Sequence, residues 1–136
     1  MVHRNDLAKT VTELDYLVLL TPLTPETRGI VNAKVLGAMK KGSYLVNLAR
    51  GGVLDEDALI AALDQGHIAG AALDVFQTEP LPPEHRFWSM KNVIVTTHQG
   101  GFCDTYPDLA LPVIETNMRC FLSGNTEGMI NVVRRP

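Results

Sequence analysis

Four short apolar runs, separated by segments with helical signals, constrain the fold of this chain more than any other feature. The runs lie at Leu14–Leu20, Ser43–Leu48, Ile68–Val75 and Val93–Thr96. They are continuously apolar rather than alternating, as expected for parallel strands that are covered on both faces. The order strand, helix, strand, helix, strand, loop, strand, helix predicts an α/β fold: half of a doubly wound parallel sheet with right-handed crossovers and flanking helices.

The segments between the runs contain residues that begin and end helices. Asn32 and Asp55 are suited to cap two helices, because their side-chain oxygens can accept hydrogen bonds from the first free backbone amides. Gly42 and Gly66 are expected to end those helices. A last helix is predicted at about 107–122, where apolar residues recur at helical spacing.

Composition excludes several classes of function. The chain has 136 residues, of which 46% are hydrophobic and 20% charged, which is typical of a globular domain. A net charge of -3 argues against a nucleic-acid partner. No apolar run reaches the roughly 18 residues that span a membrane. The two cysteines, Cys103 and Cys120, show no CxxC pairing, which favours a reduced, cytoplasmic setting.

Four polar residues follow the predicted strands. Thr21, Arg50 and His98 come just after three of the apolar runs, and Asp74 lies at the end of the Ile68–Val75 run. Open parallel sheets bind ligands outside the carboxyl ends of their strands, so this pattern places all four at one edge. A guanidinium there can hold a carboxylate by two parallel hydrogen bonds, although Arg50 alone could equally be a surface residue.

His98 is the candidate for proton transfer, because an imidazole titrates near neutrality. Glu79 is the candidate carboxylate that orients it. Taken singly, His98 could be a structural histidine and Glu79 a solvated acid, so only their combination with Arg50 indicates catalysis. Asp74 could hold the amide of a cofactor or cap a loop. No metal site is expected, because the other histidines have no ligand spacing and are interpreted as surface residues: His3, His67 and His85.

Several longer motifs resemble the D-isomer-specific 2-hydroxyacid dehydrogenases. They are Pro22–Gly29 (PLTPETRG), Met39–Gly42 (MKKG), Val46–Gly52 (VNLARGG), Gly66–Phe76 (GHIAGAALDVF) and Glu79–Pro82 (EPLP). They occur in the family's order, which makes the resemblance specific. The resemblance identifies 6–131 as the C-terminal part of the NAD(P)-binding domain, a partial Rossmann-like sheet with the last helix at about 107–122.

The resemblance implies roles for particular residues. Arg50 would bind the carboxylate and C2 oxygen of a small 2-hydroxy or 2-keto acid, His98 would be the acid/base, and Glu79 would pair with His98. The cofactor would be NAD or NADP, with NAD slightly favoured. The residues implied to contact it are Thr21, Pro22, Leu48, Ala49, Arg50, Asp74, Gln99 and Gly100. Gln99 departs from the small or apolar residue that many members have there.

The largest departure from the family is a missing half. No GxGxxG pattern occurs in the chain, so the first βαβ unit and most of the substrate domain are expected to be absent. Without that loop the pyrophosphate loses its helix N-terminus. We therefore expect an oxidoreductase fragment of the glycerate, glyoxylate, hydroxypyruvate or phosphoglycerate type that is inactive as a lone chain, and a homodimer in the full-length enzyme. The alternative is a non-catalytic binding or oligomerisation module.

Overall fold

The computed structural model of the chain describes residues 6–133. The chain divides into two compact units, one that extends to Gly100 and one that begins at Gly101. We describe each unit by itself. The candidate site residues all belong to the first unit.

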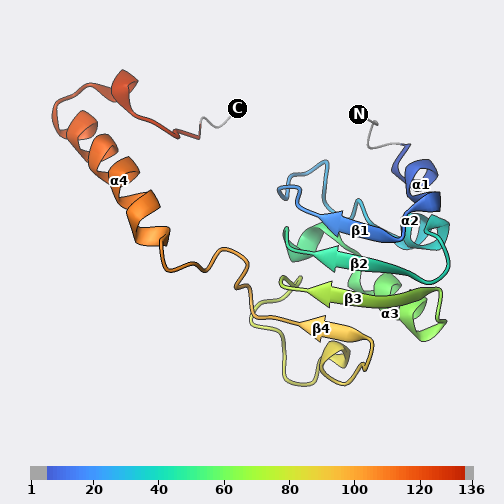
Figure 1. Cartoon of the computed structure of the whole chain (residues 1–136). Helices are drawn as coiled ribbons and strands as arrows, with labels where there is room; N and C mark the ends of the chain where they lie inside the picture. The colour runs from blue at the N-terminus through green and yellow to red at the C-terminus, as the bar shows by residue number, and fades with distance from the viewer. Residues whose placement is uncertain (1–5, 134–136) are drawn as a thin grey trace. The chain divides into compact units, whose positions relative to one another are not determined.

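The first unit is built on a parallel sheet (Figure 1). Its strands are β1 (Tyr16–Leu19), β2 (Ser43–Asn47), β3 (Ile68–Leu73) and β4 (Val93–Val95), and they lie side by side in chain order. All neighbouring pairs are parallel. The predicted α/β, Rossmann-like class is confirmed, and each strand falls within one of the apolar runs. Because the strands are parallel, their carboxyl ends share one edge of the sheet.

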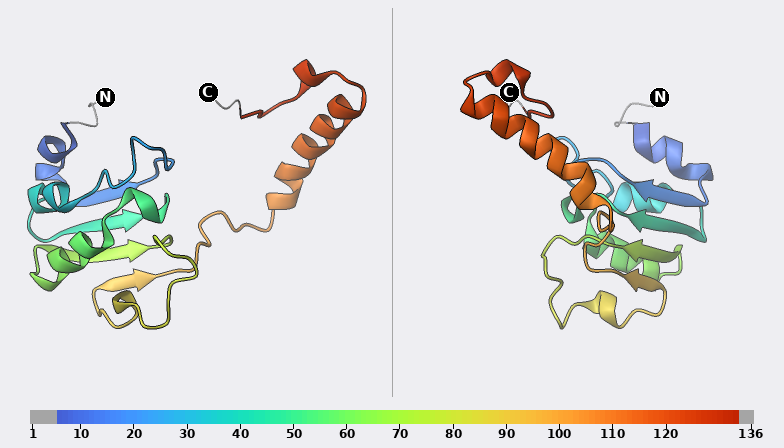
Figure 2. Two further views of the ribbon diagram at one scale, coloured as in Figure 1. Left: turned by 180° about the vertical axis from the view of Figure 1, so that it is seen from behind. Right: turned by 60° about the vertical axis from the view of Figure 1, so that its left-hand side comes forward.

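The helices of the first unit are short. They are α1 (Leu7–Thr10), α2 (Ala33–Ala38) and α3 (Glu56–Asp64), with 3-10 turns η2 (Val11–Glu13), η3 (Gly51–Val53) and η4 (Arg86–Trp88). Helices α2 and α3, which join consecutive strands, lie on the same face of the sheet in both Figure 1 and Figure 2. This follows from the right-handed crossover rule, since the chain moves across the sheet in one direction only.

Two predicted helix caps are present. The Asn32 side chain accepts hydrogen bonds from the amides of Lys34 and Val35, and the Asp55 side chain accepts one from Ala58. Gly66 follows α3 with a φ of +64°, as a helix-terminating glycine should. Gly42 does not end α2, contrary to the prediction. The helix stops at Ala38 because Met39 turns to extended backbone, and Gly42 instead forms the turn before β2.

The hydrophobic core lies between the sheet and the helices that cover it. Its fully buried side chains include Leu36, Leu45, Leu59, Ile68, Leu73 and Phe87. The opposite face of the sheet is not covered by any element of the first unit. We call it the open face: Tyr16, Val18, Tyr44 and Ile94, which are 62%, 49%, 43% and 67% exposed. The strands were expected to be covered on both faces. Within the described residues of this unit, helices cover one face and the other face is exposed.

The second unit consists of helix α4 (Tyr106–Leu122) and the 3-10 turn η5 (Thr126–Gly128). Pro112 lies inside α4, and the hydroxyl of Thr116 donates to its carbonyl at 2.7 Å. The Asn117 side chain holds the main chain at Ile130 by two hydrogen bonds: its Nδ2 donates to the Ile130 carbonyl, and its Oδ1 accepts from the Ile130 amide. None of the helices described between residues 6 and 133 has both the length and the apolar character needed to cross a membrane.

Candidate active site

Three loops meet at the carboxyl edge of the sheet, and each has one of the predicted catalytic residues. We call them the Arg50 turn (residues 50–54, after β2), the Glu79 loop (residues 76–79, after β3) and the His98 loop (residues 96–100, after β4). Glu79 and His98 come 29 and 48 positions after Arg50 in the sequence. The parallel topology alone brings the three residues to the carboxyl ends of the adjacent strands β2, β3 and β4.

The structure places Glu79 and His98 in direct contact. The Nδ1 atom of His98 lies 2.7 Å from Oε2 of Glu79, and their side chains are 45% and 35% exposed. His98 has a φ of +56°, an uncommon conformation that the surrounding chain must hold. The His98 amide donates to the Asp74 carbonyl at 2.8 Å. The ring is therefore fixed both through its backbone and through Nδ1, which leaves Nε2 as the nitrogen that a ligand can meet.

Glu79 is itself held in place. Its Oε1 accepts a hydrogen bond from the Phe76 amide at 2.9 Å. Burial works to raise the pKa of Glu79, but the hydrogen bonds from His98 and Phe76 and the positive charges of His98 and Arg50 outweigh it, so the pKa lies below its usual value. Glu79 is therefore an ionised hydrogen-bond acceptor for the His98 ring near neutrality.

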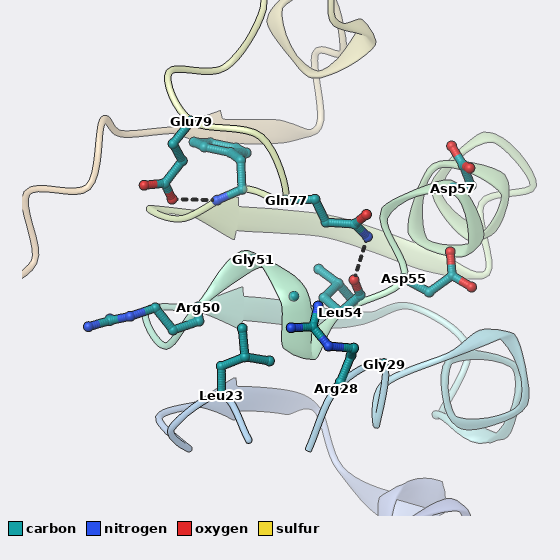
Figure 3. A pocket seen from close by; sticks show the side chains of 12 residues that line it. Leu23, Arg28, Gly29, Arg50, Gly51, Leu54, Asp55, Asp57, Gln77 and Glu79 are labelled. Carbon is teal, nitrogen blue, oxygen red and sulfur yellow. Dashed lines mark hydrogen bonds between the residues drawn. The ribbon is translucent and has the colours of Figure 1, made fainter. Parts of the chain in front are cut away.

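Arg50 and Glu79 line the same cavity, of about 710 Å³, which also includes Arg28, Gly52 and Gln77 (Figure 3). The Arg50 side chain is exposed, and its Nη1 donates to the Ala49 carbonyl at 2.6 Å. In Figure 3 Arg50 comes from the turn after β2, and Glu79 from the loop after β3.

A second cavity, of about 390 Å³, lies on the His98 side of Glu79. Its lining includes Glu79, Trp88, Thr97 and His98. His98 and Glu79 are thus connected by a hydrogen bond. Arg50 makes no such bond to Glu79, but the two line one cavity and the positive charge of Arg50 lowers the pKa of Glu79. A cationic anion-binding group and an oriented imidazole on either side of one carboxylate can hold an organic acid and transfer a proton.

Gly51 makes this arrangement compact. A Cβ at Gly51 would lie 1.9 Å from the Phe76 carbonyl carbon and 2.3 Å from the Gln77 nitrogen. Only a residue without a side chain allows the Arg50 turn to pack directly on the backbone of the Glu79 loop.

Asp74 is buried and organises the His98 loop. Its Oδ1 accepts from the Gln99 amide at 2.9 Å and from the Thr96 hydroxyl at 2.5 Å, and its Oδ2 accepts from the Gly100 amide at 2.7 Å. Burial works to raise its pKa, but these hydrogen bonds hold it below its usual value. Of its two predicted roles, the loop cap is thus visible, while the contact to a cofactor amide stays a prediction.

The remaining predicted cofactor residues lie at the ends of β1 and β2. Thr21 is half-buried and Pro22 exposed, while Leu48 presents a side chain that is 47% exposed. The Leu48 amide donates to Leu19, and the Ala49 amide donates to the Asn47 side chain. An exposed apolar side chain thus lies beside polar backbone groups at these strand ends, and their contact with a cofactor stays a prediction. The GxGxxG pattern that would place a helix N-terminus at the pyrophosphate does not occur in the sequence.

Three residues of the site were not predicted. Glu56 and Gln77 had no expected role in the site. His85 was interpreted as a surface residue, but its side chain is only 23% exposed and its Nδ1 accepts from the Phe87 amide. No sequence signal marks these residues, since their partners lie elsewhere in the chain. His3 lies outside the described residues, and residues 6–133 contain no group of three His, Cys, Asp or Glu side chains that could hold a metal.

Comparisons with known proteins show the family of the chain. Residues 1–100 match the model for the NAD binding domain of D-isomer specific 2-hydroxyacid dehydrogenases. A glyoxylate/hydroxypyruvate reductase A from Photorhabdus laumondii subsp. laumondii is 43% identical over 85% of this chain and 37% of that protein. The chain therefore spans little more than a third of the length of the curated relatives it matches.

Solved structures show the same likeness. A D-isomer specific 2-hydroxyacid dehydrogenase from Xanthobacter autotrophicus Py2, in complex with NADPH and MES, is 43% identical with a TM-score of 0.83, over 96% of this chain and 52% of that one. An NADPH-dependent glyoxylate/hydroxypyruvate reductase from Sinorhizobium meliloti, with NADP and sulfate, is 38% identical with a TM-score of 0.77, over 88% and 39%. The chain belongs to the family of D-isomer specific 2-hydroxyacid dehydrogenases.

Proposed function

We propose that this chain contributes the catalytic residues and the nicotinamide side of an NAD- or NADP-dependent reductase of small 2-keto acids. The hydrogen bond of 2.7 Å between Glu79 and His98, beside the Arg50 cavity, is the observation that carries the proposal. The named activities of relatives support glyoxylate and hydroxypyruvate as substrates.

Arg50 binds the substrate. Its guanidinium holds the carboxylate and the C2 oxygen of the keto acid, which polarises the carbonyl and fixes its orientation. Asp74, through the Gln99 and Gly100 amides, keeps the His98 loop in the conformation that brings the imidazole to the same place. The bound nicotinamide supplies the hydride that C2 receives.

His98 supplies the proton. Its Nε2 gives a proton to the C2 oxygen as the carbonyl is reduced, so one hydride and one proton turn the 2-keto acid into the 2-hydroxy acid. Glu79 stays ionised, holds Nδ1 and stabilises the imidazolium that donates. The reverse oxidation uses the neutral ring as a base.

A chimera tests this proposal. The chain is fused behind the part of the Photorhabdus laumondii reductase that precedes the matched segment, so that the fusion includes a part of the relative that this chain does not match. We expect the purified chimera to oxidise NADH or NADPH when glyoxylate or hydroxypyruvate is added, and the 136-residue chain alone to show no saturable turnover. A folded chimera that binds the nucleotide but reduces neither acid would contradict the proposal. Saturable turnover by the 136-residue chain alone would contradict its expected inactivity.

A second candidate function is a non-catalytic binding or oligomerisation module. The open face of the sheet favours it, because Tyr16, Val18 and Ile94 expose apolar surface that a partner or a second copy could cover. Mass determination by light scattering, with and without NADPH, separates the two functions. A stable dimer that does not respond to the nucleotide supports the module, whereas a nucleotide-dependent change supports the enzyme.

A further inference from the structure

We propose that Glu56 is a positioning residue of the candidate active site: it holds the Glu79 loop against the Arg50 turn. The inference deepens the proposed function and rests on it for its catalytic meaning. The contacts that carry it belong to helix α3 and to the two loops.

Glu56 joins a helix to the Glu79 loop. It is the first residue of α3, is 9% exposed, and its Oε1 accepts a hydrogen bond from the Gln77 amide at 2.7 Å. The two residues are 21 positions apart. The cap of α3 is the neighbouring Asp55, which accepts from Ala58, so Glu56 is not needed to begin the helix.

Gln77 continues the connection to the Arg50 turn. Its side-chain Nε2 donates to the Leu54 carbonyl at 2.8 Å, as Figure 3 shows. At the other end of the same turn, Gly51 lies against the peptide between Phe76 and Gln77. The Glu79 loop is thus fixed to both ends of the Arg50 turn.

Neighbouring amides connect Glu56 to the catalytic pair. The Gln77 amide donates to Glu56, and the preceding Phe76 amide donates to Oε1 of Glu79, whose Oε2 meets His98. Rotation of the backbone at this point would move both amides together. Loss of the first contact is therefore expected to loosen the second, and with it the orientation of the imidazole.

His85 lies beside the other carboxylate oxygen of Glu56. Its Nε2 is 3.8 Å from Oε2 of Glu56, and its Nδ1 accepts a hydrogen bond from the Phe87 amide. Burial raises the pKa of Glu56, the Gln77 amide and His85 lower it, and Asp57 and Glu79 raise it further. A carboxylate at the surface is ionised at little cost, whereas this one is buried and accepts a hydrogen bond from a loop amide. We therefore interpret Glu56 as a clamp, a side chain that holds the Glu79 loop in place.

Three substitutions at Glu56 separate the effect of its side-chain length from the effect of its charge. Glu56→Ala removes the acceptor, Glu56→Asp keeps the charge but shortens the side chain, and Glu56→Gln keeps the length and an acceptor oxygen without the charge. Glu84→Gln changes an exposed carboxylate outside both cavities and serves as the control. The first measurement is hydrogen exchange at the Gln77 and Phe76 amides, with the core amide of Leu45 as the reference for global stability.

We expect Glu56→Ala and Glu56→Asp to speed exchange at the Gln77 amide by roughly tenfold to a hundredfold relative to Leu45, the effect of leaving this donor without its acceptor. Glu56→Gln keeps an acceptor oxygen in place, so it and the Glu84→Gln control should leave the exchange rate close to that of the wild type. The second measurement is the NMR signal of the His98 Nδ1 proton. It should be lost to exchange with water or move upfield in the first two variants only.

Unchanged exchange at Gln77 in both Glu56→Ala and Glu56→Asp would overturn the proposal, and so would faster exchange with an unchanged His98 signal. If Glu56→Ala does not fold, the difference between Glu56→Asp and Glu56→Gln decides. Both measurements use the 136-residue chain without substrate. An inactive chimera with the expected exchange pattern would therefore contradict the proposed reaction alone, and an active chimera with no exchange difference would contradict the clamp alone.

Discussion

The carboxyl edge of the sheet and its open face are built from the same strands and the loops that follow them. The polar groups at the edge have partners within this chain, whereas the apolar side chains of the open face are uncovered. At the edge, the carboxylates of Glu56, Asp74 and Glu79 all accept hydrogen bonds from loop amides. On the open face, the rings of Tyr16 and Tyr44 stack with centroids 5.3 Å apart, but no element of the first unit covers them.

The difference shows which parts of the site depend on the rest of the protein. The loops at the carboxyl edge are held in place by this chain itself, because every contact that supports them joins two of its described residues. Apolar surface on the open face is stabilised only when something covers it. We therefore expect substitutions at the edge to have large effects in this chain, and substitutions on the open face to have small ones until a covering partner is present.

The largest expected effect is catalytic. In the chimera, His98→Asn should lower kcat by about 10²- to 10⁴-fold, the usual contribution of a general acid. Glu84→Gln, a change at an exposed residue outside both cavities, is the control. Steady-state kinetics with glyoxylate measures both variants, and a His98→Asn enzyme within a factor of three of wild type would exclude the imidazole as the acid.

The next effect is steric. Gly51→Ala should lower the free energy of unfolding by about 3 kcal/mol, because a Cβ would meet the backbone of Phe76 and the chain must move to make room. Gly37→Ala is the matched control, since a Cβ there meets nothing within 4 Å. Urea titrations compare the two. Equal midpoints would mean that the Arg50 turn does not pack on the Glu79 loop as described.

Asp74→Asn should cost about 2 kcal/mol, because one oxygen and an NH₂ group replace a carboxylate that accepts from Gln99 and Gly100. The effect should depend on pH. The pKa of Asp74 is lowered in the folded state, so its stabilisation is complete above the ordinary Asp pKa and disappears as acidification passes through the folded value. Unfolding measured down to low pH should show the two proteins converging, and a constant difference would contradict this reading.

The pH dependence of stability that comes from Glu56 should have the opposite sign to that from Asp74. The pKa of Glu56 is raised in the folded state, so the part of the stability that depends on its protonation is present below the ordinary Glu pKa and is lost as pH rises through the raised value.

The smallest effect is expected on the open face. Val18→Thr should change stability by less than about 0.5 kcal/mol, since the side chain is 49% exposed. Val31→Thr places the same hydroxyl in the core, where the valine is fully buried, and should cost about 2 kcal/mol. Thermal unfolding of both variants tests the contrast, and an equal loss would show that the open face is already covered in solution, for example by a second copy.

The regular parts of this structure were predictable because their signals are local. The apolar runs predicted the strands, and Asn32 and Asp55 predicted two helix starts, since a cap depends only on the residues that follow it. The strand ends then placed Arg50, Asp74 and His98 at one edge. The contact between Glu79 and His98 was predicted from the residue types, and the family resemblance implied the same pair.

The rest of the site was not predictable because it depends on loop conformation. Glu56 and Gln77 meet across 21 residues, and Asp74 and Gly100 across 26, and no periodicity encodes either distance. The open face was missed because an apolar run shows that a strand can be buried on both sides, but not that covering elements are present.

One structure determination tests the central claim most directly: the chimera crystallised with NADPH and oxamate, an unreactive mimic of a 2-keto acid. The account predicts that the oxamate carboxylate binds the Arg50 guanidinium, while its amide carbonyl oxygen lies within hydrogen-bond distance of His98 Nε2 and His98 keeps its contact with Glu79. Oxamate bound away from Arg50, or a His98 ring turned away from Glu79 in the ternary complex, would contradict the account.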